Sequence, residues 1–312
     1  MRPSTPRERV LAILWIALAN AIGGLSYPAQ KAALAGLPPA TITLLRNVVA
    51  LLALLVVARV WRISFRAWSR RDLGRVFLLG TAAFGLPMVL GIVGVERSSA
   101  ANGSILILLE PVTIVAIAGI FMGERIGGAK LASIVLGLAG ALAIVLEGAS
   151  LGDLFGGEHA LGNAILALHG ILWGCYTPLA KPLAEKHDPV GLCLLTTAFS
   201  LLLLGPAAYF ERAEWRAWPE LVPALLWCLA IGLFVSFLST FLWLAALRHI
   251  PSTSVAGLVF LQPLAGVLAG VLFLGERLST TVIAGGVLIV LGVALDVVVT
   301  AARGRAGGQL AA

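Results

Sequence analysis

Residues 111–125 read PVTIVAIAGIFMGER, and residues 263–277 read PLAGVLAGVLFLGER. Six of these fifteen aligned positions are identical, including the opening proline, Phe121 with Phe273, and the closing Gly-Glu-Arg. Self-similarity at a fixed spacing indicates an internal repeat. The two segments lie 152 residues apart in a chain of 312, so each half of the chain carries one copy.

The correspondence extends outward from these segments. Pairs at a spacing of 150 or 152 residues are Glu110 and Gln262, Asn102 and Ser254, Pro28 and Pro178, Lys31 and Lys181, and Pro39 and Pro189. Shared prolines and a shared charged terminus make chance similarity among apolar helices a poor explanation. We therefore assign residues 1–150 to a first repeat and residues 151–312 to a second.

Composition places both repeats in a membrane. The chain is 60% hydrophobic and 12% charged, with a mean hydropathy of +1.01, whereas a soluble domain has about 25% charged residues. Apolar stretches such as 42–58 and 281–300 match the ~30 Å hydrocarbon thickness of a bilayer. Because these stretches are apolar on all sides, they indicate helices rather than barrel strands. The sequence predicts an all-α integral membrane protein with about ten transmembrane helices.

The expected spans divide evenly between the repeats. We place them near residues 10–32, 39–60, 74–95, 100–122, 127–147, 160–182, 189–209, 219–247, 252–274 and 279–301. Each repeat contains five expected spans. Because five is an odd number, the second copy must enter the membrane inverted. Inverted repeats around a central cavity are a recurring architecture of secondary transporters.

Basic residues in the loops predict the orientation. With a cytoplasmic N-terminus, 16 Lys and Arg residues lie on the cytoplasmic side and 5 on the other, and Arg46 lies within a span. Short cytoplasmic loops carry such an excess. We expect a protein of the cytoplasmic (inner) membrane with both termini in the cytoplasm. Because topology explains the basic charge, we expect no nucleic acid as a partner. The expected partners are a lipid bilayer and a small-molecule substrate.

Glu110 and Arg46 are ionisable residues inside spans, and both are candidate substrate-binding groups. An ionisable side chain at the centre of a span costs about 2.5–3.5 kcal/mol on insertion scales, so it is a functional candidate. Glu110 directly precedes Pro111, whose missing N–H frees a backbone carbonyl one turn earlier. Its carboxylate can bind a substrate ammonium or take up a proton. The alternative is a structural ion pair between Glu110 and Arg46. Asp296, near the end of a span, is interpreted as an interface residue.

Polar stripes on other spans are further candidates for lining a cavity. Asn20, Gly24, Tyr27 and Lys31 lie on one face of the first span, and His169, Trp173 and Tyr176 on one face of the sixth. Asn102 and Gln262 lie in the repeat-matched fourth and ninth spans. Hydrogen bonds between helices, worth about 0.6–2 kcal/mol each, are the alternative interpretation.

The chain resembles the EamA family of the drug/metabolite transporter superfamily. The resemblance rests on LLEPV…FMGERI at 108–126 and FLQPL…FLGERL at 260–278, with support from LPPATITLLR at 37–46 and GCYTPLAKP at 174–182. It implies ten helices in two inverted five-helix repeats around a central cavity, and export of metabolites such as amino acids. Arg46 matches a basic residue common in the second span of the family, whereas its counterpart Thr196 is uncharged.

The sequence therefore predicts a secondary transporter working by alternating access, an exporter of amino acids or related compounds. A drug, nucleotide-sugar or organic-cation carrier is an alternative. A membrane-embedded enzyme acting on a lipid-linked substrate is another, but the four histidines are scattered and no HExxH occurs. No phosphate-binding GxxxxGK[ST] occurs either. We expect no catalytic residue, metal or cofactor. Protons are a candidate coupling ion, and the sequence carries no signal for oligomeric state.

Overall fold

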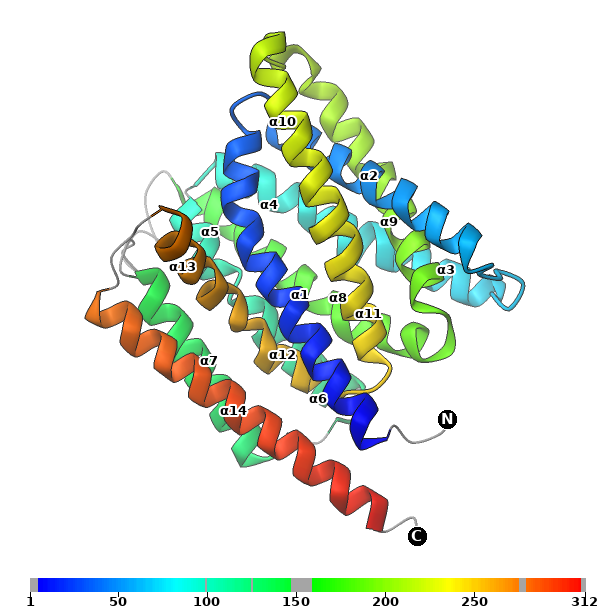
Figure 1. Ribbon diagram of the computed structural model, residues 1–312, viewed down its shortest axis with the longest axis vertical. Helices are drawn as coiled ribbons and strands as arrows, with labels where there is room; N and C mark the ends of the chain where they lie inside the picture. The colour runs from blue at the N-terminus through cyan, green and yellow to red at the C-terminus, as the bar shows by residue number, and fades with distance from the viewer. Residues whose placement is uncertain (1–4, 99, 125, 147–158, 275–278, 310–312) are drawn as a thin grey trace.

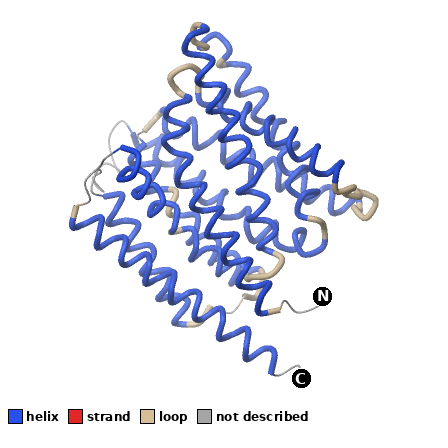
Figure 2. Tube along the Cα trace, in the orientation of Figure 1, coloured by secondary structure: helices blue, strands red, loops and turns tan. Residues whose placement is uncertain are grey.

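The protein is described by a computed structural model that covers residues 5–98, 100–124, 126–146, 159–274 and 279–309. These residues form α-, 3-10 and π-helices, and no strand occurs among them (Figure 2). The predicted all-α class is confirmed. Arg125 and the second Gly-Glu-Arg, at 275–277, lie outside the described residues.

The first half of the chain contains α1 (Pro6–Ala33), α2 (Pro39–Val60), α3 (Arg70–Leu78), η1 (Leu79–Gly85), α4 (Leu86–Glu96), α5 (Ala100–Leu106), α6 (Leu109–Phe121) and α7 (Gly128–Leu146). The second half contains α8 (Ala160–Lys186), α9 (Pro189–Phe210), η4 (Arg212–Glu214), α10 (Trp218–Ile231), η5 (Gly232–Ser239), α11 (Thr240–Leu247), α12 (Ser252–Val259), α13 (Leu261–Leu274) and α14 (Thr280–Gln309).

Seven helical stretches among the described residues are long and apolar enough to cross a membrane. They are Pro6–Leu25, Pro39–Val60, Arg70–Gly94, Gly128–Leu146, Pro189–Phe210, Trp218–Leu247 and Thr280–Val299. Two shorter apolar helices, Leu109–Phe121 and Ser252–Leu268, accompany them. The chain is a multi-pass membrane protein. Helix α8 is also long, but polar residues such as Asn163, His169 and Lys181 interrupt its apolar sequence.

The predicted fourth and ninth spans are not continuous helices. The first is divided into α5 and α6, and the second into α12 and α13. Each second piece begins two residues before a proline, Pro111 or Pro263, which cannot donate a backbone hydrogen bond. At the first break the Glu110 N–H donates instead to the Ile107 carbonyl at 2.9 Å, one residue closer than in an α-helix. Each of these two predicted spans is therefore made of two helical pieces, and a proline lies just after each break.

Two π-helical segments occur at matching places in the two halves. Segment η1 packs on α9, and η5 packs on α2. Glycine allows both approaches: a Cβ on Gly80 would lie 2.7 Å from the Thr196 carbonyl oxygen, and one on Gly232 would lie 2.8 Å from that of Arg46. Single π-helical turns inside α-helices are frequent at functional sites.

The halves pack across one another (Figure 1). Helix α1 packs on α13, and α8 packs on α6, so the opening helix of each half lies against the broken helix of the other. Helices α7 and α14 lie side by side at one edge, and α2 packs on α9. The start of α1 and the end of α14 lie at the same end of the bundle (Figure 1).

A buried ion pair joins α7 to α14. The Lys130 ammonium contacts the Asp296 carboxylate, and the two side chains are 2% and 1% exposed. Hydroxyl oxygens of Ser254 and Ser133 lie 3.5 Å from the Lys130 nitrogen and the Asp296 carboxylate, respectively. Asp296, interpreted from the sequence as an interface residue, is buried in this helix contact, and its charge is compensated by a lysine 166 positions away.

Candidate functional site

Glu110 is a buried acid with no hydrogen-bond or ion-pair partner among the described residues. It lies in the first turn of α6, and its side chain is 2% exposed. On α8, Gly170 and Gly174 face this part of α6: a Cβ on Gly174 would lie 2.7 Å from the Glu110 carbonyl oxygen. Gly170 and Gly174 therefore place no side chain between α8 and this part of α6.

The matching position in the other half is satisfied. Gln262 lies in the first turn of α13, and its amide nitrogen donates to the Asn20 side-chain oxygen at 2.9 Å. Asn20 in turn donates to the Ile16 carbonyl at 2.8 Å. Gly24 allows this contact between α1 and α13, since its Cβ would lie 2.8 Å from that of Ala265. Asn20 and Gln262, both predicted site residues, are brought together and bind each other.

Arg46 is half-buried and engaged by neutral groups. Its Nε donates to the Ser236 hydroxyl at 2.9 Å, and its Nη1 donates to the Gln30 side-chain oxygen at 3.4 Å. These contacts connect α2 with η5 and α1. The predicted alternative of a Glu110–Arg46 ion pair is absent from the described structure.

The three predicted residues of α8 gather in one aromatic cluster. His169 Nδ1 lies 2.6 Å from the Pro87 carbonyl oxygen. Trp173 stacks on Phe84 with ring centroids 5.6 Å apart, and Tyr176 lies 5.2 Å from the same ring. The Tyr176 hydroxyl is buried and makes no hydrogen bond within the described residues. Phe84 belongs to η1, so the π-helical segment supplies the ring that joins the cluster.

Asn102 lies in a separate polar cluster at the start of the broken helix. Its amide nitrogen donates to the Ser98 hydroxyl and to the Asn163 side-chain oxygen, both at 3.1 Å. Ser98 also donates to Asn163. These bonds connect α5 to α8 and match the interpretation of Asn102 as a residue that holds helices together. The side chain of Tyr27 lies outside the described part of the structure.

Two glutamates that the site prediction did not include bind helix N-termini. Glu124 accepts from the backbone N–H groups of Ser252 and Thr253 at 2.8 and 2.9 Å, and from the Thr253 hydroxyl at 2.8 Å. Glu211 accepts from Ala40 and Thr41 with the same pattern, at 2.9, 2.8 and 3.1 Å. A carboxylate is favourable at a helix N-terminus. A shared signal was present in the sequence, since Thr41 and Thr253 each follow a proline by two residues.

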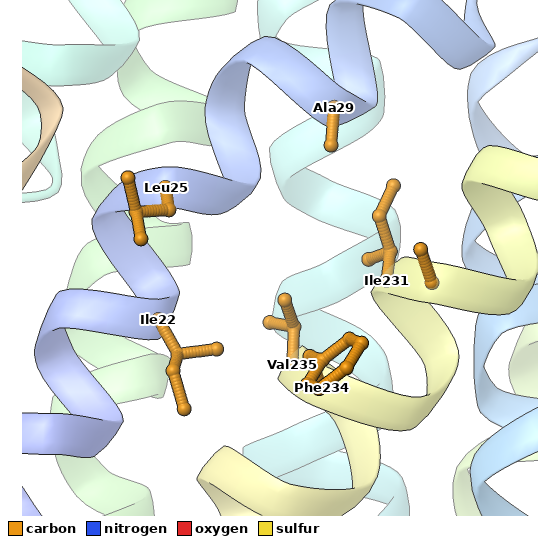
Figure 3. Close-up of a pocket in the computed structure, with 7 residues that line it drawn as sticks. Ile22, Leu25, Ala29, Ile231, Phe234 and Val235 are labelled. Atoms are coloured by element: carbon orange, nitrogen blue, oxygen red, sulfur yellow. The ribbon is translucent and has the colours of Figure 1, made fainter. Parts of the chain in front are cut away.

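An apolar cavity of about 260 Å³ lies between α1 and α10–η5 (Figure 3). Its lining residues are Ile22, Leu25, Ala29, Ala230, Ile231, Phe234 and Val235. Leu25 and Phe234 are 45% and 57% exposed, so this cavity opens at the outer surface of the helix bundle. None of the predicted site residues whose side chains the structure describes lines it.

The described residues contain no group of three or more His, Cys, Asp and Glu that could hold a metal ion. What they hold instead is a buried unpaired acid, an engaged guanidinium and an aromatic cluster, all on helices that cross between the halves.

Comparison with known proteins identifies the family. The model of the EamA-like transporter family matches residues 10–146 and again residues 160–298. The chain belongs to the EamA-like transporter family. The resemblance found in the sequence is thereby confirmed. Because the family is one of transporters and its relatives are named as transporters, this EamA-like chain is a membrane transporter.

Individual relatives span most of the chain. An uncharacterized transporter of Bacillus subtilis, YvbV, is 26% identical over 94% of this chain and 92% of its own length. A protein of Streptantibioticus cattleyicolor, named as a probable terminal-alkyne amino-acid exporter, is 29% identical over 86% of this chain and 88% of its own. A solved crystal structure covering 95% of this EamA-like chain, at 19% identity and a TM-score of 0.77, shares the fold.

Proposed function

We propose that this protein is a secondary carrier that exports amino acids or related compounds across the cytoplasmic membrane by alternating access, with both termini in the cytoplasm. The observation that carries the proposal is the crossed packing of the two halves. A carrier built from inverted repeats can face either side of the membrane when the two halves exchange conformations.

Contacts that recur between the halves support two inverted repeats, residues 1–150 and 151–312, of five spans each around a central cavity. Gly24 packs on the backbone and side chains at 262–265, and Gly174 packs in the same way at 110–113. Helix breaks and π-helical segments also recur at matching places. Each repeat therefore depends on the other for its closest helix contacts, as expected if the two move against each other.

Within this architecture we assign substrate recognition chiefly to Glu110 and the aromatic cluster. Glu110 has no partner in the described structure, so it is available for the ammonium group of a substrate. Trp173 and Tyr176 offer an apolar surface with a free hydroxyl for the rest of the molecule. Arg46 is placed to meet a carboxylate if it exchanges its bond to Ser236. The Asn20–Gln262 bond favours a structural role for that pair.

Amino acids are favoured as substrates by one relative, the probable terminal-alkyne amino-acid exporter, which aligns with most of this chain. An organic-cation carrier is the second candidate. It is favoured by the contrast between Glu110, which is unpaired, and Arg46, which is already bonded to Ser236 and Gln30. A site with one free acid suits a cation without a carboxylate.

A thermal-stability screen of the purified protein separates these candidates. The ligands are amino acids, including one with a terminal alkyne, organic cations, and nucleotide sugars. A ligand at 100 times its dissociation constant stabilises the native state by about 2.7 kcal/mol. We expect amino acids to raise the unfolding midpoint, and Trp173→Ala to reduce the rise. Leu202→Ala, on an exposed face of α9, is the matched control. If organic cations alone raise the unfolding midpoint, the organic-cation assignment replaces the amino-acid assignment.

A further inference from the structure

The two halves of the protein differ at one matched position, and the difference leaves the Glu110 carboxyl group without a hydrogen-bond partner among the described residues. Gln262 is bonded to Asn20, and Glu110 stands where Gln262 stands in the other repeat. The position that matches Asn20, 150 residues later, is Gly170. The carboxyl group of Glu110 therefore lacks the amide that satisfies its counterpart.

We infer that Glu110 is the site at which the carrier binds and releases a coupling proton during its cycle. This inference rests on the proposed function and names the ion that drives it. Glu110 is 2% exposed, and an ionised carboxylate buried without a partner is strongly disfavoured relative to the neutral acid. A proton neutralises the Glu110 carboxylate and, unlike a larger cation, needs no cavity beside it.

Among the described residues, no charged side chain pairs with Glu110 in place of the proton. Helix α6 packs on α8 and α12. Helix α12 (Ser252–Val259) has no ionisable side chain. The ionisable side chains along the middle of α8 are His169, Cys175 and Tyr176, and the contacts of His169 and Tyr176 are to Pro87 and Phe84. Gly170 and Gly174 of α8, which pack against residues 106–113, carry no side chain.

The place of Glu110 on α6 also allows the proton to leave. The side chain lies in the first turn of a helix of 13 residues, where the helix dipole favours a negative charge. That effect is smaller than the cost of burying an unpaired charge, so the neutral acid is favoured while the site is closed. When the neighbouring helix moves and water enters, the dipole and water together stabilise the carboxylate. The chemical step is the reversible transfer of one proton between water and the carboxylate oxygen.

The first test does not depend on substrate. Infrared difference spectra of the protein in lipid vesicles, recorded between mildly acidic and alkaline buffers, report the C=O stretch of a protonated carboxyl group. We expect such a band in the native protein and in Glu214→Gln, which removes an exposed acid in η4, and its loss in Glu110→Gln. Glu110→Asp should keep a shifted band, which guards against misfolding of the glutamine variant. An unchanged band in Glu110→Gln overturns the inference.

The second test measures coupling in vesicles with a clamped membrane potential and an amino acid carrying a terminal alkyne as the probe. A pH difference of one unit supports up to about tenfold accumulation for one-to-one coupling. We expect accumulation with the native protein and with Glu214→Gln, and none with Glu110→Gln, which removes both the proton site and the carboxylate proposed to bind the substrate ammonium group. If Glu110→Gln still accumulates the probe, the proton site is wrong while the carrier function stands. If no form moves the probe, the substrate assignment fails, and the infrared result alone decides on the proton site.

Discussion

Replacing Lys130 by methionine removes one charge from a pair that is buried between α7 and α14. The side chains of Lys130 and Asp296 are 2% and 1% exposed, so water does not reach the remaining carboxylate without opening the helix contact. Methionine keeps most of the volume of the lysine stem, and the variant therefore tests charge rather than packing.

The expected loss follows from the burial of the pair. Breaking a buried ion pair by removing one partner costs about 3–5 kcal/mol of unfolding free energy, because it leaves an uncompensated charge. At about 2–4 °C per kcal/mol, the unfolding midpoint should fall by roughly 6–20 °C. Removing both charges, in Lys130→Met with Asp296→Leu, should return the stability to within about 1 kcal/mol of the native protein or raise it.

Thermal unfolding in one fixed detergent or lipid measures Lys130→Met, Asp296→Leu and the double variant, with Arg66→Met, an exposed loop position, as the control. A stabilising double variant beside an unstable Lys130→Met establishes the coupling between the two charges. The reasoning is refuted if Lys130→Met unfolds with the native protein, or if the double variant is as unstable as the sum of the single changes.

Three further variants test contacts between the halves. Glu124→Ala removes the acceptor of three hydrogen bonds at the start of α12 and should lower the unfolding free energy by about 2–4 kcal/mol, whereas Glu214→Ala at an exposed site should change it by less than about 0.5 kcal/mol. Gly174→Val should force α8 from α6 and abolish transport, because its Cβ alone would lie 2.7 Å from a backbone oxygen; Gly205→Ala, with nothing within 4 Å, should transport normally in the same vesicle assay. Asn20→Ala should cost about 1 kcal/mol in chemical denaturation, and an unchanged midpoint would remove its role as a structural partner.

The sequence predicted the helical class and the internal correspondence because both depend on local composition. A shortage of charge excludes a soluble globule, and apolar length indicates membrane spans. Pro111 and Pro263 even marked the two places where spans break. Each proline lies at the third position of the second helical piece, and the preceding piece ends four or five residues before it.

Partners across the fold could not be predicted in the same way. Lys130 and Asp296 are 166 residues apart and carry no pattern that connects them. Asn20 and Gln262 were both predicted as site residues, but only packing shows that each satisfies the other. The contribution of Phe84 depended on a π-helical segment, which no periodicity in the sequence indicates.

The same limit applies to Glu110. Its position in a span was evident from the sequence, whereas its burial without a partner among the described residues, beside Gly170 and Gly174 of α8, was not. Repeat alignment held part of the answer, because it matches Asn20 with Gly170. That match becomes meaningful only when the structure shows Asn20 bonded to the counterpart of Glu110.

Counterflow in reconstituted vesicles tests the carrier function most directly. Vesicles are loaded with an excess of the unlabelled amino acid that stabilises the protein most, and a trace of the labelled compound is added outside. Alternating access predicts that the label rises transiently above its equilibrium level inside and then declines, because each inward passage exchanges for an outward one. A monotonic approach to equilibrium, as through a channel, or no uptake of any stabilising ligand would contradict a carrier.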